Sequence, residues 1–162
     1  MKNRIIFGSL LLIACVTLAI NSACSISENK TLDGAQIECK DLIRNRLLWS
    51  EKKIVDYDMV VRYLPHSPLP AASPVLIKVR NNKAVSIEPF SQNIKGTLVF
   101  YSIFDTVDKM FEMIQKDLED GAEVKVLFNS ELGYPETVYV TPKLSNAYYQ
   151  LHIDKFDVAK SL

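Results

Sequence analysis

The residues of this chain that point most directly to a covalent reaction are its cysteines. There are three of them, Cys15, Cys24 and Cys39. Cys24 follows an apolar run over residues 5–20, which begins after two basic residues and is shorter than the roughly 20 residues of a membrane-spanning helix. A basic start, a short apolar core and small residues before a cleavage point are typical of an export signal. We therefore expect residues 1–23 to be a signal peptide and Cys24 to be the first residue of the mature protein.

A cysteine in that position predicts lipid attachment, as in bacterial lipoproteins. The stretch Leu-Ile-Ala-Cys that ends at Cys15 also fits the lipoprotein pattern, but it would leave the apolar residues 16–20 on the mature protein. Cys24 lies at the end of the apolar run and is followed by polar residues, although Asn21 stands where the pattern prefers leucine. We expect the lipid on Cys24, and the alternative is ordinary cleavage after Ala23 without lipid.

Cys39 distinguishes these two possibilities. If Cys24 carries lipid, Cys39 is an odd thiol in an oxidising compartment. If Cys24 carries no lipid, the two cysteines can form a disulfide that closes a short loop. Neither of them belongs to a Cys-x-x-Cys pair, so zinc binding and thioredoxin-like chemistry are not expected.

The remaining residue types indicate no reaction. His66 and His152 are isolated, and the carboxylates are numerous but scattered. The chain has no Gly-x-Ser-x-Gly motif and no glycine-rich phosphate loop. After residue 23 there are seventeen basic and nineteen acidic residues, without the basic stripe of a nucleic-acid-binding protein. We expect no cofactor, no metal, no nucleic acid and no enzymatic activity.

Two segments are candidates for contact with a partner. One is a loop over residues 64–74 with four prolines, and the other is the turn Leu132-Gly133-Tyr134-Pro135, whose alternative interpretation is a left-handed Gly133 and an inward-packed Tyr134. The candidate contact residues are Pro65, His66, Pro68, Pro70 and Tyr134.

The elements that position these residues follow from hydrophobic periodicity. Residues 36–54 favour a helix with Ile43, Leu47 and Ile54 on its buried face and Trp49 as a core anchor. The clearest helix begins at Asp105 or Thr106, has a stripe over residues 107–118 and ends at Gly121. The ranges expected to be strands are 57–63, 75–79, 84–87, 124–128, 137–140 and 148–153, and residues 98–101 are either a short strand or the start of the next helix.

This order predicts one α+β domain with two helices packed on antiparallel β-meanders: helix, three strands, helix, three strands. Residues 24–35 are polar and lack periodicity, so we expect them to be a tether between the membrane and a single domain over residues 36–162.

Several of these motifs together resemble a bacterial family catalogued as domain of unknown function 6174, composed largely of small exported lipoproteins. The resemblance extends from about Leu47 to Phe156 and rests on short motifs, among them Leu48-Trp49, Ile54-Val55-Asp56-Tyr57, Thr106-Val107-Asp108 and Leu132-Gly133-Tyr134-Pro135. Many members carry a Cys-x-Cys after the first strand, where this chain has Tyr63-Leu64-Pro65, so any role of those cysteines is absent here. The resemblance implies an envelope location and an α+β domain, and no reaction.

The leading hypothesis is therefore a membrane-anchored binding or accessory module of a bacterial envelope, tied to the membrane by lipid on Cys24 and possessing an envelope protein partner. The alternative is a soluble secreted inhibitor or binding protein, cleaved after Ala23, that inserts the loop over residues 65–74 into its target. A third hypothesis, an enzyme using Asp56, Asp58 or Glu131, has the least support.

Overall fold

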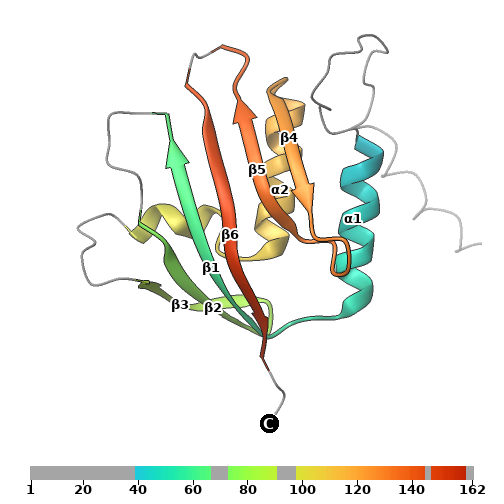
Figure 1. Ribbon diagram of the computed structural model, residues 1–162. Helices are drawn as coiled ribbons and strands as arrows, with labels where there is room; N and C mark the ends of the chain where they lie inside the picture. The colour runs from blue at the N-terminus through green and yellow to red at the C-terminus, as the bar shows by residue number, and fades with distance from the viewer. Residues whose placement is uncertain (1–38, 67–72, 91–97, 145–146, 160–162) are drawn as a thin grey trace, which may run out of the picture. The chain divides into compact units, whose positions relative to one another are not determined.

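The computed structural model describes residues 39–66, 73–90, 98–144 and 147–159. They form two α-helices, one 3-10 helix and six strands (Figure 1). In chain order these are α1 (Cys39–Lys52), β1 (Tyr57–Pro65), β2 (Val75–Arg80), β3 (Lys83–Pro89), η1 (Leu98–Ile103), α2 (Val107–Glu119), β4 (Glu123–Phe128), β5 (Pro135–Thr141) and β6 (Tyr149–Val158). The predicted order of helix, three strands, helix, three strands is confirmed.

The six strands form one sheet in the order β3-β2-β1-β6-β5-β4. Every neighbouring pair in it is antiparallel. Each group of three strands is a meander, and the two meanders join through the pairing of β1 with β6 at the centre of the sheet. The predicted α+β class is therefore confirmed, and the two meanders form a single sheet.

The hydrophobic core lies between one face of this sheet and α2, which Figure 1 shows behind the strands. Alternate residues of the strands point into it, as the two-residue period of a strand requires. The buried strand residues include Tyr57, Met59, Val61, Val75, Ile77, Val79, Val124, Val138, Val140 and Leu151, and α2 contributes Val107, Met110, Phe111 and Ile114. No described helix covers the other face of the sheet, which is called the uncovered face below.

α2 begins and ends as its sequence predicts. Thr106 is the N-cap, and its side chain accepts a hydrogen bond from the backbone N–H of Lys109. Gly121 follows the helix with a φ of +78°, a left-handed conformation that glycine adopts without strain. The predicted stripe over residues 107–118 is the buried side of this helix.

α1 buries a different face from the one that its sequence predicts. Its buried residues are Leu42, Asn45 and Trp49, whereas Ile43 and Leu47 are 53% and 57% exposed. The prediction for Ile43 and Leu47 was wrong, and that for Trp49 as a core anchor is confirmed. The error arises because hydropathy alone places Asn45 in solvent, whereas the structure buries it. The side-chain amide of Asn45 donates to the backbone carbonyl of Asp41, so it has a hydrogen-bond partner inside the protein.

Two strands are longer than the alternation of residue types suggests. β6 continues past residue 153 to Val158, because a β-bulge at Asp154 shifts the alternation by one residue and returns Phe156 to the core face. β1 continues to Pro65, which pairs with Tyr149 at the end of the ladder, where a proline is tolerated. The predicted loop start at residue 64 was therefore wrong.

The hairpin between β2 and β3 matches the sequence. Asn81 and Asn82 have φ angles of 51° and 59°, the positive values that favour asparagine in tight hairpin turns. Residues 98–103 form a 3-10 helix, and so they are not an extra strand.

Candidate functional site

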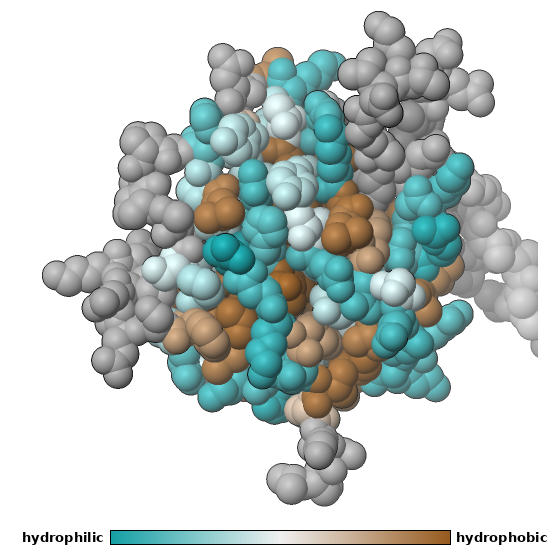
Figure 2. Space-filling view, viewed as in Figure 1, coloured by the Kyte–Doolittle hydropathy of each residue, from teal (hydrophilic) through white to brown (hydrophobic). Residues whose placement is uncertain are grey.

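The uncovered face of the sheet is the surface on which polar and aromatic side chains from different strands meet. Figure 2 shows this face, where hydrophilic residues surround separate hydrophobic areas. Arg62 of β1 lies opposite His152 of β6, and His152 lies opposite Thr137 of β5. Neighbours across an antiparallel sheet are close enough to interact directly, so these three residues form one row.

The β-bulge at Asp154 adds a carboxylate to this row. Asp154 has no residue opposite it in β1, because Val60 pairs with Lys155 and Val61 with Ile153. The guanidinium of Arg62 donates to both oxygens of Asp154, from Nε at 3.0 Å and from one terminal nitrogen. The bulge therefore redirects a side chain into a bidentate ion pair, a geometry that fixes the arginine.

His152 is held between two polar neighbours. Its Nδ1 lies 3.3 Å from the hydroxyl of Thr137, and its Nε2 lies 3.2 Å from the amide oxygen of Gln150. Partial burial lowers the pKa of His152, the positive charge of Arg62 lowers it further, and Asp154 partly opposes both effects. The imidazole is therefore mainly neutral at pH 7, and its hydrogen bonds orient it within the surface.

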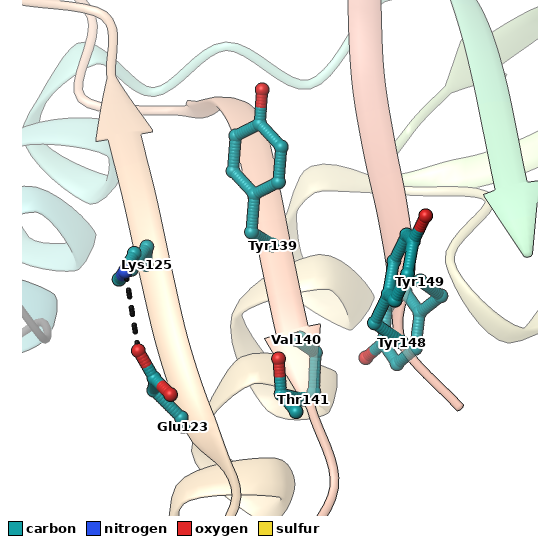
Figure 3. Close-up of a pocket in the computed structure, with 7 residues that line it drawn as sticks. All are labelled: Glu123, Lys125, Tyr139, Val140, Thr141, Tyr148 and Tyr149. Atoms are coloured by element: carbon teal, nitrogen blue, oxygen red, sulfur yellow. Dashed lines mark ion pairs between the residues drawn. The ribbon is translucent and has the colours of Figure 1, made fainter. Parts of the chain in front are cut away.

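A shallow hollow of about 240 Å³ lies at one end of the same region. Figure 3 shows its lining: Glu123 and Lys125 on β4, Tyr139, Val140 and Thr141 on β5, Tyr148 just before β6 and Tyr149 at its start. Tyr139 and Tyr148 are 44% and 43% exposed, and an ion pair of 3.2 Å joins Glu123 to Lys125. The hollow offers aromatic and hydrogen-bonding contact area to a bound molecule.

Behind this hollow, Tyr149 connects β6 to α2. Its hydroxyl donates to the carboxylate of Asp117. Burial raises the pKa of Asp117, and burial together with this hydrogen bond raises the pKa of Tyr149. The pair attaches the helix to the central strands, and it lies on the core side of the sheet.

The predicted contact residues of the proline loop are only partly described. Pro65 ends β1, and His66 donates its backbone N–H to the carbonyl of Tyr148 at 2.7 Å. The imidazole of His66 stacks near the ring of Tyr148, with 4.2 Å between the ring centroids. Pro68 and Pro70 lie outside the described residues. The structure thus places His66 beside the tyrosines of the hollow, and a partner contact there remains a prediction.

Tyr134, the other predicted contact residue, is only 7% exposed. Its ring stacks on Phe156 at 4.4 Å and meets Trp49 edge-on at 6.5 Å. The predicted left-handed conformation of Gly133 is confirmed by its φ of +82°. The structure thus supports the inward-packed interpretation of Tyr134, and the ring offers little surface to a partner.

Asn129 is a structural residue of this turn that sequence reasoning missed. Its side-chain oxygen accepts hydrogen bonds from the backbone N–H groups of Glu131 and Leu132, at 3.1 and 2.8 Å. This Asx-turn pattern is a known property of asparagine, so an asparagine directly after a strand is the signal that would have identified it.

Of the carboxylates considered for catalysis, two have structural partners and the third is exposed. Asp58 forms a 2.8 Å ion pair with Arg80, and Asp56 accepts the backbone N–H of Asn81. Glu131 lies exposed in the turn after β4. Neither of the two hollows identified on the described part of the chain is lined by any of these three.

The described residues also show neither a metal centre nor a membrane span. Across residues 39–66, 73–90, 98–144 and 147–159, no group of three or more histidine, cysteine or carboxylate side chains lies close enough to hold a metal ion. No helix in the same ranges is long and apolar enough to cross a membrane.

Cys39 is disulfide-bonded at the start of α1. The chain has two other cysteines, Cys15 and Cys24, and both lie outside the described residues, as does the predicted tether. The predicted lipid site at Cys24 is therefore not observed directly.

Comparison with known proteins identifies the family of this domain. No curated protein matches the chain. A model of a family of unknown function, DUF6174, matches residues 41–156. This range includes all of the helices and strands except the first two residues of α1 and the last two of β6. Since this match extends over most of the chain, the protein belongs to the DUF6174 family.

Proposed function

We propose that this protein is a lipoprotein of the bacterial envelope, in which the DUF6174 domain is a binding or accessory module held at a membrane by lipid on Cys24. The observation that carries the proposal is the position of Cys24, at the end of the apolar run of an export signal and ahead of a polar stretch. The polar residues 24–35 would then be the tether between the anchor and the domain.

The uncovered sheet face supports a binding role for the domain. It carries the ordered row of Arg62, His152 and Thr137 and, beside it, the hollow with Tyr139 and Tyr148. Aromatic residues and arginine are enriched at protein interfaces. The rigid strands below hold these side chains in place, as a recognition surface requires.

Substituting the two candidate cysteines separately tests the anchor. The full-length chain is expressed in a bacterial host that processes lipoproteins, as wild type, Cys24→Ser and the matched control Cys15→Ser. We expect wild type and Cys15→Ser in the membrane fraction after washing with high salt, and Cys24→Ser in the soluble fraction. Release of the wild type by salt or by osmotic shock alone would contradict the anchor.

A soluble exported protein is the second candidate, and the disulfide at Cys39 is the observation that favours it. A cysteine whose sulfur carries lipid cannot also form a disulfide, so a Cys24–Cys39 bond excludes lipid on Cys24. In this version the protein is a secreted inhibitor that inserts the loop over residues 65–74 into its target. Deleting residues 67–72 would then abolish partner binding, and unchanged binding would exclude the inhibitor.

A further inference from the structure

The solvent side of α1 has a composition that its packing does not explain. Ile43 and Leu47 lie one helical turn apart and are 53% and 57% exposed. Arg44, between them, is exposed as well and forms an ion pair of 3.3 Å with Asp41. Large aliphatic side chains exposed next to each other on a helix commonly mark an interaction site.

This apolar side borders an open groove of about 890 Å³. The groove is lined on the helix by Lys40, Ile43, Arg44, Asn45, Leu47, Leu48 and Glu51, and at the end of β4 and in the turn after it by Phe128 and Ser130. The groove therefore extends the apolar area of α1 to the end of β4.

The charge of this element differs in sign from that of the rest of the mature chain. Residues 39–52 contain four basic and two acidic residues, whereas the other residues after Ala23 contain thirteen basic and seventeen acidic. The basic surplus of the domain is thus concentrated on the helix with the exposed aliphatic residues. A partner surface that carries negative charge and accepts apolar side chains complements it best, and an anionic lipid surface has both properties.

The connectivity of the chain brings this helix near a membrane if Cys24 is lipidated, so the inference rests on the proposed function. Cys24 and Cys39 are fifteen positions apart, and a fully extended chain of that length reaches about 50 Å at most. Lipid anchoring becomes firm when a second, electrostatic or apolar, contact adds to the acyl chains.

We propose that α1 lies against the anionic phospholipid surface, with Ile43 and Leu47 inserted at the level of the headgroups and the basic side chains of the helix near the lipid phosphates. α1 then serves as a second attachment that orients the domain on the membrane.

Vesicle binding of the mature chain without lipid tests this contact. Residues 24–162 with Cys24→Ser are mixed with vesicles of phosphatidylcholine alone, or with about one third of phosphatidylglycerol, and sedimented. We expect binding to the anionic vesicles only, and its loss at high salt because the Debye length falls. Absence of binding to the anionic vesicles, or equal binding to both kinds, would overturn the proposal.

Variants localise the contact to α1. Arg44→Gln should weaken binding about five-fold, and the double change Ile43→Ser with Leu47→Ser about ten-fold or more. The matched control is Val85→Ser, which removes an aliphatic side chain that is 61% exposed on β3 and should leave binding unchanged. Thermal unfolding of each variant establishes that it is folded. Equal binding by the double variant and the control would overturn the role of α1.

The result of the vesicle experiment can be distinguished from the result for the anchor, because an intact mass measurement alone detects the lipid on Cys24. If the protein carries lipid but its unlipidated form does not bind anionic vesicles, the role of α1 is overturned and the anchor is retained. Vesicle binding in a protein that never carries lipid would overturn the anchor and support α1 as the membrane contact.

Discussion

The hydroxyl of Tyr57, in the first residue of β1, accepts a hydrogen bond of 2.9 Å from the backbone N–H of Val107, the first residue of α2. The two residues are fifty positions apart in the chain. The first N–H groups of a helix have no hydrogen-bond acceptor within the helix. The hydroxyl of Tyr57 is that acceptor for Val107, and the bond joins the N-terminus of α2 to the central strands.

Removing that hydroxyl should destabilise the domain. Tyr57→Phe leaves the N–H of Val107 buried without a partner, and we expect a loss of about 1–3 kcal/mol in the free energy of unfolding. Urea denaturation followed by circular dichroism measures it. Tyr139→Phe removes a hydroxyl from an exposed ring and is the control, expected within about 0.5 kcal/mol of wild type. Equal effects of the two changes would contradict the structural role of Tyr57.

Gly133 is predicted to tolerate no side chain. A Cβ there would lie 2.5 Å from the backbone oxygen of Asn45 in α1, and the φ of +82° adds strain. We expect Gly133→Ala to cost about 3 kcal/mol or more, since strain and overpacking act together.

Gly121→Ala is the control for the contact of Gly133. Gly121 has a similar φ of +78°, but the nearest atom to its Cβ would be the flexible Lys143 Cδ at 3.4 Å. We expect a cost of about 1 kcal/mol from backbone strain alone. Thermal unfolding measures the loss of stability of both variants. Equal losses would contradict the close contact between Gly133 and α1.

Neighbouring aliphatic residues of α1 test which of its faces is buried. Leu42 is 5% exposed and Ile43 is 53% exposed. Leu42→Ala should lower the free energy of unfolding by about 2–4 kcal/mol, whereas Ile43→Ala should change it by less than about 1 kcal/mol. Chemical denaturation of both variants is the measurement. The reverse order would mean that the helix packs by the face that its hydropathy favours.

His152 should titrate below the usual histidine pKa of about 6.5, because burial and Arg62 disfavour its protonated form. Because the pKa of His152 is lower in the folded than in the unfolded state, the unfolded chain binds the proton more tightly. The neutral imidazole therefore contributes stability above about pH 6.5, and this contribution is lost as the pH falls through the folded-state pKa. We expect Arg62→Gln to raise the His152 pKa, since it removes a cation and frees Asp154. NMR titration of the imidazole carbons measures this shift, and an unchanged pKa would contradict the contact.

Much of this fold could be predicted from local patterns because its elements obey simple periods. α2 has a polar cap, one apolar stripe and a terminal glycine, and each of these follows from the geometry of a helix. The hairpin at Asn81 and Asn82 likewise follows from the positive φ that its turn requires.

The remaining features depend on tertiary contacts that periodicity does not contain. The bulge at Asp154 breaks the alternation of β6, and only the tertiary structure shows that it brings the carboxylate to the guanidinium of Arg62. α1 buries the face that contains Asn45, not the face that hydropathy predicts. Asn45 is tolerated there because its amide donates to a backbone carbonyl and because Gly133 lies close to its backbone. The row of Arg62, His152 and Thr137 belongs to three strands, and their register brings it together.

The intact mass of the mature protein, purified from the membranes of its own host, tests the central claim most directly. The account predicts a chain that begins at Cys24 and carries the additional mass of acyl chains. A chain that begins at Cys24 without lipid, and two hydrogens lighter because Cys24 and Cys39 form a disulfide, would contradict the anchor and establish a soluble exported protein.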